Sequence, residues 1–100
     1  METKIMLFGS SHCPDNGPAT DILDERNVEY TYIDITSDMP SLKMFLKMRD
    51  KSPAYAELRG GDTIGIPCLQ VDDVEYVIDG PEHLERIING LGARASRPHQ

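Results

Sequence analysis

The sequence predicts one α/β domain in which a small mixed sheet of four strands carries helices on both of its faces. Four runs rich in apolar and β-branched residues are typical of strands: 4–8, 28–35, 66–71 and 75–79. Apolar residues recur at helical spacing after the first, second and fourth of these runs, which gives the order β-α-β-α-β-β-α. Because no periodicity remains in 93–100, we expect a folded domain over 1–92 followed by a disordered tail.

The first half of the chain alternates between strand and helix. The run "KIMLF" at 4–8 is continuously apolar, as in a strand that is buried on both faces. "ATDILDERN" at 19–27 shows helical spacing, and "VEYTYIDI" at 28–35 favours a second strand. Two strands that are joined by a helix are expected to pair in parallel through a right-handed crossover.

The second half opens and closes with a helix. The segment 36–50 predicts a helix capped by Ser37 or Asp38, with a proline in its first turn. The next two strands are separated by an Asp-Asp pair, which favours an antiparallel hairpin. The last helix follows from apolar residues at i, i+3, i+4 and i+7, starting at Leu84.

Composition limits the partners and the compartment. The formal net charge of −7, spread along the chain, argues against nucleic acid and anionic membranes as partners. Two cysteines are too few for a disulfide-stapled secreted fold. The apolar run near the N-terminus is too short for a signal peptide or a membrane span. We therefore expect a cytoplasmic protein, acting as a monomer.

The stretch "CPDN", residues 13–16, lies between the first strand and the first helix and holds the candidate nucleophile, Cys13. A helix N-terminus favours the reactive thiolate, and Pro14 suits the first helical position. The negative charge of Asp15 opposes the thiolate. Asn16 stands where C-x-x-C proteins have their second cysteine and cannot resolve a mixed disulfide, so an external thiol has to do so.

The order of elements, with Cys13 at the first strand-to-helix turn and Ile66-Pro67 opening the third strand, resembles the thioredoxin fold and, within it, the glutaredoxin family. The likeness covers roughly residues 4–91, and bacterial glutaredoxin-related proteins, which have C-P-D-C, are the most similar group. Three stretches carry it: "CPDN" at 13–16, "GIP" at 65–67 and "DGPEHL" at 79–84.

This resemblance implies a thiol–disulfide oxidoreductase with no bound cofactor, acting on protein disulfides or with glutathione or another low-molecular-weight thiol as cosubstrate. It also implies a cis peptide bond at Ile66-Pro67, with the backbone of Ile66 pairing with the substrate. Asp79 and Gly80 correspond to a Gly-Gly pair that contacts the cosubstrate, and Ser10 replaces a lysine that helps to hold glutathione. Both differences weaken a glutathione site.

The middle helix is locally basic, and Arg49, on its apolar side, is a candidate for binding the carboxylates of a cosubstrate. An ordinary solvated charge is the alternative. Cys68 is expected to pack as a small buried hydrophobe and not to pair with Cys13, because strand alternation points it away from the side of Pro67. No metal site is predicted, because His12, Cys13 and Asp15 lack the spacing of metal ligands.

Three functions remain open on the sequence alone. The first is an oxidoreductase that works through Cys13 by a monothiol mechanism. The second is a non-catalytic binding module of the same fold, and the third is an iron–sulfur cluster carrier. The family members that carry clusters have C-G-F-S, which "CPDN" does not match, and one thiolate per chain is few for a cluster that needs four ligands.

Overall fold

The computed structural model describes residues 3–95 of the chain. Its seven longer elements follow the predicted order: β1 (Ile5–Gly9), α1 (Asn16–Glu25), β2 (Thr31–Asp34), α2 (Met39–Lys51), β3 (Cys68–Val71), β4 (Val74–Val77) and α3 (Pro81–Leu91). Two 3₁₀ turns, η1 (Pro53–Tyr55) and η2 (Gly92–Arg94), follow α2 and α3. Within residues 3–95, none of the helices is long and apolar enough to cross a membrane.

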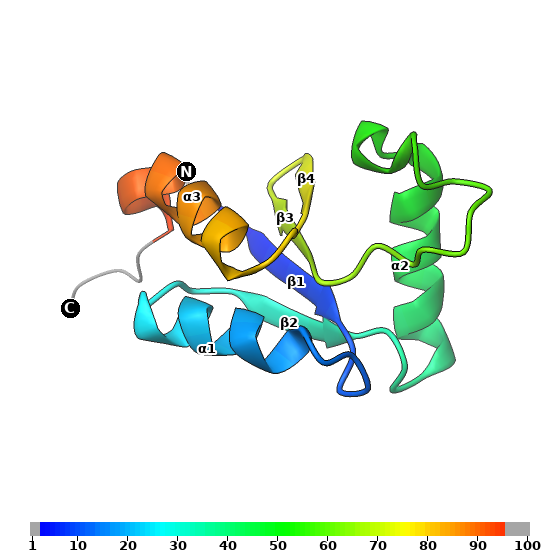
Figure 1. Cartoon of the computed structure of the whole chain (residues 1–100), viewed down its shortest axis with the longest axis horizontal. Coiled ribbons are helices and arrows are strands. Elements are labelled where there is room, and N and C mark those ends of the chain that lie inside the picture. The colour runs from blue at the N-terminus through cyan, green and yellow to red at the C-terminus, as the bar shows by residue number, and fades with distance from the viewer. Residues whose placement is uncertain (1–2, 96–100) are drawn as a thin grey trace.

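The four strands form one mixed sheet in the order β2-β1-β3-β4 (Figure 1). β1 pairs with β2 in parallel and with β3 antiparallel, and β3 and β4 form the predicted antiparallel hairpin. Leu7 lies opposite Tyr32 on one side and Leu69 on the other. The predicted fold class and both predicted strand pairings are confirmed.

Helices cover both faces of the sheet, because the inner strands are apolar on both. One core cluster joins β1 and β3 to α1 and α3: Ile5, Leu7, Ala19, Leu23, Val28, Leu69, Val71, Leu84, Ile87, Ile88, Leu91 and Ala95. The other lies on the α2 side: Phe8, Ile35, Phe45, Tyr55 and Cys68. Leu7 and Phe8 are neighbours in β1 yet fall in different clusters, as the alternation of side chains along a strand requires.

The helix after Cys13 begins at Asn16, before the periodic segment 19–27 but after Pro14, and Asp15 is its N-cap. Pro18 therefore falls in the first turn, where backbone N–H groups have no partner within the helix and a missing one costs nothing. The placing of Pro14 at the first helical position is wrong. Pro14 lies in the turn before the cap.

At its other end, the chain is ordered further than the sequence predicts. Gly92–Arg94 form a 3₁₀ turn, and Ala95 is only 3% exposed in the core beneath α1 and α3. The carbonyl of Ala95 also accepts the N–H of Glu29 at 3.3 Å. A disordered tail from residue 93 is therefore wrong for 93–95, because a small apolar side chain fills space there. The rest of that predicted tail lies outside the described residues.

Candidate functional site

Cys13 lies half-buried in a tight turn between β1 and α1. Its N–H donates to the carbonyl of Ser10 at 3.0 Å, and its own carbonyl accepts the N–H of Asn16 at 3.1 Å. We call residues 10–16 the Cys13 turn. Because β1 and β2 are parallel, their carboxyl ends meet at one edge of the sheet, and the turn lies beside the end of β2.

Side chains from the end of β2 fix the Cys13 turn. Asp34 Oδ2 accepts the N–H of Ser11 at 3.3 Å. Ser10 is 2% exposed, shares a 2.7 Å hydrogen bond with Thr36 Oγ1 and accepts the N–H of His12 at 3.1 Å. Ser10, which stands where the resemblance implies a lysine, is thus a buried support of the backbone.

Asp34 is held as a carboxylate close to this turn. Hydrogen bonds from the hydroxyl and the N–H of Thr36, at 2.6 Å and 2.9 Å, hold the pKa of Asp34 below its ordinary value. A negative charge therefore stands beside the Cys13 turn across the neutral pH range.

Asn16 turns its side chain inward, against the backbone of β1. A Cβ atom placed on Gly9 would lie 2.1 Å from Asn16 Oδ1, so only glycine fits beneath this amide. Asn16 Oδ1 is buried and has no hydrogen-bond partner among the described residues. The position of a resolving thiol is thus filled by a group that has no thiol–disulfide chemistry.

Tyr32 on β2 is a neighbour of both residues. Burial raises the pKa of its hydroxyl, a hydrogen bond with the Asn16 side chain opposes that rise, and the charges of Asp34 and Cys13 add to it. The side chain of Tyr32 is therefore close enough to feel the charge on the Cys13 sulfur.

A small cavity of about 50 Å³ lies beside the Cys13 turn, between α1, α3 and the start of β3. It brings together residues that are far apart in the sequence: Asp15, Pro18, Ala19, Pro67, Ile78, Gly80, Pro81 and Leu84. Three of the predicted site residues, Asp15, Pro67 and Gly80, therefore share one cavity. Its lining is apolar apart from the carboxylate of Asp15 and the backbone.

The Ile66–Pro67 peptide bond is cis, and the carbonyl of Pro67 accepts the N–H of Ile78 at 3.0 Å. Ile66 is partly buried against the core on the α2 side. Just before it, Tyr55 Oη donates to the carbonyl of Gly65 at 2.7 Å. Gly65 has φ +89°, and a Cβ there would lie 2.3 Å from Tyr55 Cε1. The loop therefore needs glycine at this position on two counts.

Arg49 points into the loop that leads to Gly65. Its guanidinium donates to the carbonyls of Leu58 at 3.1 Å, Thr63 at 2.9 Å and Ile64 at 3.1 Å, and it lies 5.6 Å from the centre of the Tyr55 ring. Arg49 thus has internal partners, and its predicted role in binding a cosubstrate stays a prediction.

Cys68 is fully buried in the core on the α2 side. Burial raises the pKa of its thiol to about 11, although a hydrogen bond with Tyr55 opposes the rise. The expectation that Cys68 packs as a small hydrophobe is confirmed, and β3 carries it on the face opposite α1. Both cysteines are free thiols.

Asp79 and Glu82 stand at the start of α3, beside the small cavity. The N–H of Asp79 donates to His83 Nδ1 at 2.8 Å, which ties the residue before Gly80 to the first turn of α3. Asp79 keeps its carboxylate exposed. Within residues 3–95, no group of three or more His, Cys, Asp or Glu side chains is placed to hold a metal ion.

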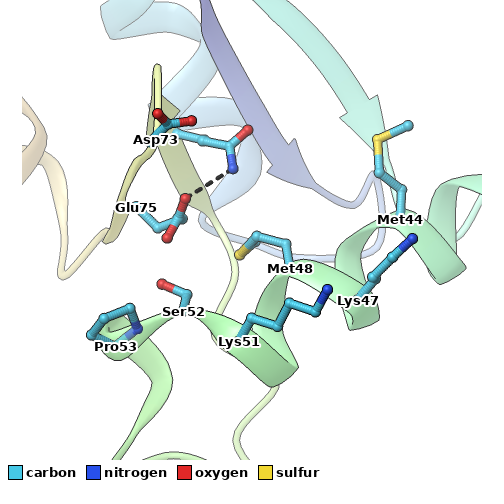
Figure 2. Close-up of a pocket in the computed structure, with 9 residues that line it drawn as sticks. Met44, Lys47, Met48, Lys51, Ser52, Pro53, Asp73 and Glu75 are labelled. Atoms are coloured by element: carbon cyan, nitrogen blue, oxygen red, sulfur yellow. Dashed lines mark hydrogen bonds between the residues drawn. The ribbon is translucent and has the colours of Figure 1, made fainter.

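A larger cleft of about 450 Å³ lies elsewhere, between the second half of α2 and the β3–β4 hairpin (Figure 2). Lys47 and Lys51 project from the helix, and Asp73 and Glu75 stand on the hairpin side. Gln70 donates to Glu75 at 2.9 Å on that side. No cysteine lines this α2 cleft.

Sequence reasoning missed Tyr32 and Asp34 as parts of the site. Both lie on the strand that pairs in parallel with β1, and polar residues at the end of such a strand are brought to the same edge. The Asp-Ile-Thr sequence at the end of the second strand, residues 34–36, was the available signal. The partnership of Tyr55 with Gly65 left no comparable trace in the sequence.

A four-stranded mixed sheet with helices on both faces and a cysteine directly after β1 defines a protein of thioredoxin-like fold. The family model of glutaredoxin matches residues 5–76, and the chain belongs to the glutaredoxin family. An uncharacterized protein of Haemophilus influenzae is 32% identical over 77 residues, which cover 77% of this chain and 90% of that protein.

Proposed function

We propose that this protein is a thiol–disulfide oxidoreductase in which Cys13 acts alone and an external thiol completes each cycle. The observation that carries the proposal is the contrast around Cys13. Cys13 is half-buried in a turn, Asn16 occupies the resolving position, and Cys68 is fully buried on the other side of the sheet. We propose a cytoplasmic setting, where low-molecular-weight thiols are abundant.

The reaction has two exchanges. The Cys13 thiolate attacks one sulfur of a substrate disulfide, the substrate S–S bond breaks, and a mixed disulfide with Cys13 forms. The second substrate sulfur leaves as a thiolate and takes a proton from solvent. A low-molecular-weight thiolate, glutathione or another, then attacks the substrate sulfur of the mixed disulfide, the bond to Cys13 breaks, and Cys13 leaves as a thiolate ready for the next cycle. The product is a disulfide between the substrate and the small thiol, and a second small thiol reduces it in a further exchange.

The decisive experiment follows the mixed disulfide by intact-mass spectrometry in the wild type and in Asn16→Cys. The substrate is a small uncharged disulfide. We expect the wild-type adduct to persist until a thiol is added, and the Asn16→Cys adduct to decay without one, at least about tenfold faster, because the second sulfur is held nearby. Cys13→Ser is the control and should form no adduct.

An adduct of the wild type that decays equally fast without added thiol would contradict the monothiol mechanism. A wild type that forms no adduct, with its Cys13 accessible to iodoacetamide, would favour the non-catalytic binding module instead.

A further inference from the structure

The charges around Cys13 are all of one sign. Four segments build this part of the molecule: 9–19, 31–38, 64–67 and 78–84. They contain five carboxylates and neither lysine nor arginine: Asp15, Asp34, Asp38, Asp79 and Glu82. We call these five residues the acidic corner.

The carboxylates have few internal cations to neutralise them. Asp34 is held by Thr36 and by a backbone N–H, and Asp38 caps α2 by accepting the N–H of Ser41 at 2.8 Å. Each of the two ion pairs formed within residues 3–95, Arg26–Glu85 and Arg94–Asp72, lies outside these segments. His83 accepts the N–H of Asp79 at its Nδ1.

The cation predicted to bind an anionic cosubstrate, Arg49, has internal partners. The guanidinium of Arg49 donates to three loop carbonyls, and Ser10 in the Cys13 turn is a buried hydroxyl that hydrogen-bonds Thr36. Glutathione is an anion at neutral pH, so it meets like charge around Cys13 and no described lysine or arginine among these segments. A disulfide that is flanked by cationic residues is attracted to the same carboxylates.

We propose that the substrate recognised at this site is a disulfide within a basic polypeptide segment, with lysine or arginine next to the cysteine. This rests on the proposed function. The substrate cations face the acidic corner, and a small apolar side chain of the same segment enters the 50 Å³ cavity beside Pro67. The corner concentrates such a segment near Cys13, and salt weakens the effect. Smaller thiols still serve as the final reductant.

The test uses two matched peptides, one with lysines and one with glutamates flanking a cysteine, each activated as a 2-pyridyl disulfide. Release of pyridinethione measures the attack of Cys13. At low ionic strength, about 0.01 M, we expect the basic peptide to react at least about tenfold faster, and the ratio to fall to about two or less near 1 M salt. A ratio near one at low salt overturns the proposal.

The double variant Asp15→Asn, Asp79→Asn should lower this ratio at least about threefold. Taking the ratio within one variant cancels any change in the intrinsic reactivity of Cys13. Asp73→Asn removes one carboxylate at the far hairpin turn and should leave the ratio unchanged, whereas an equal fall there would assign the effect to net charge and overturn the acidic corner.

An uncharged pyridyl disulfide separates the two proposals. If it fails to react with the wild type, the proposed function itself is wrong. If it reacts while the peptide ratio stays near one, only the basic substrate is wrong.

Discussion

Two hollows within residues 3–95, the α2 cleft and the cavity beside Pro67, show that the larger hollow is not the reactive one. The α2 cleft, about 450 Å³, has lysines on one wall and carboxylates on the other, and no cysteine lines it. The cavity beside Pro67 holds about 50 Å³, yet it borders the Cys13 turn and the acidic corner. Volume therefore says little about where the chemistry lies. The reactive end of the sheet is marked instead by the Cys13 thiol, by the hydrogen bonds that hold its turn, and by the carboxylates of the acidic corner.

The largest expected effect separates the two cysteines. Cys13→Ser should lower the rate of thiol–disulfide exchange by at least about a thousandfold, because the attacking sulfur is gone. Cys68→Ala should keep the wild-type rate and lose about 1 kcal/mol of unfolding free energy through the small void it leaves. Rates with an uncharged disulfide and urea denaturation measure both. Activity lost in Cys68→Ala, with its fold intact, would contradict the assignment of the nucleophile.

The loop beside Pro67 should depend on Gly65 more than on any exposed glycine. Gly65→Ala combines φ +89° with a Cβ only 2.3 Å from Tyr55, so we expect a loss of about 3 kcal/mol in unfolding free energy. Gly90→Ala, in α3 with nothing within 4 Å, should gain up to about 1 kcal/mol. Urea midpoints of the two variants give the comparison, and similar values for both would refute the close fit of Tyr55.

Alkaline pH should lower the unfolding free energy, because the Cys68 thiol ionises less readily in the folded state than in the unfolded chain. Burial raises its pKa from 9.0 to about 11, so the unfolded chain releases this proton first and unfolding free energy falls as pH rises between these values. The fall should be roughly 2 kcal/mol, on the scale of 1.36 kcal/mol per pKa unit. Cys68→Ala should flatten this part of the profile in urea titrations from pH 8.5 to 11. A profile unchanged in the variant would assign the slope to other groups.

The smallest effect belongs to the α2 cleft. Lys47→Gln and Lys51→Gln remove its cations, and we expect both variants to attack an uncharged disulfide within about twofold of the wild-type rate, since lone exposed charges contribute little. Stopped-flow traces on the two variants provide the measurement. A change beyond tenfold would make the cleft part of the reactive end after all.

The fold was largely predictable because its signals are periodic. Leu84, Ile87 and Leu91 repeat with the helical period, and "KIMLF" marks a central strand without help from tertiary contacts. The start of α1 could not be predicted, because Pro18 argues against a helix unless it is known to lie in the first turn. The acidic corner could not be predicted either. Asp15, Asp34 and Asp79 are distant in sequence, and only the crossover of β1 to β2 and the start of α3 bring them together.

Arg49 shows how a pattern can place a residue correctly and leave its task open. The sequence puts it on the apolar side of its helix, and it does lie over the ring of Tyr55. Its charged end, however, is taken up by carbonyls 9 to 15 residues further along the chain. Every residue has a backbone carbonyl, so the residue types of the loop do not predict which carbonyls Arg49 will bind.

The grip of Arg49 on its loop also has a consequence for proteases. Trypsin cleaves after an arginine whose chain is extended and whose side chain is free, and Arg59 meets neither condition. Its guanidinium donates to the carbonyls of Arg49 and Ser52, while Arg49 holds the carbonyl of Leu58 just before it. The exposed loop from 58 to 64 should therefore resist nicking in the native protein. Cleavage after Arg59 would therefore report sensitively that the hydrogen bonds of Arg49 to this loop have broken.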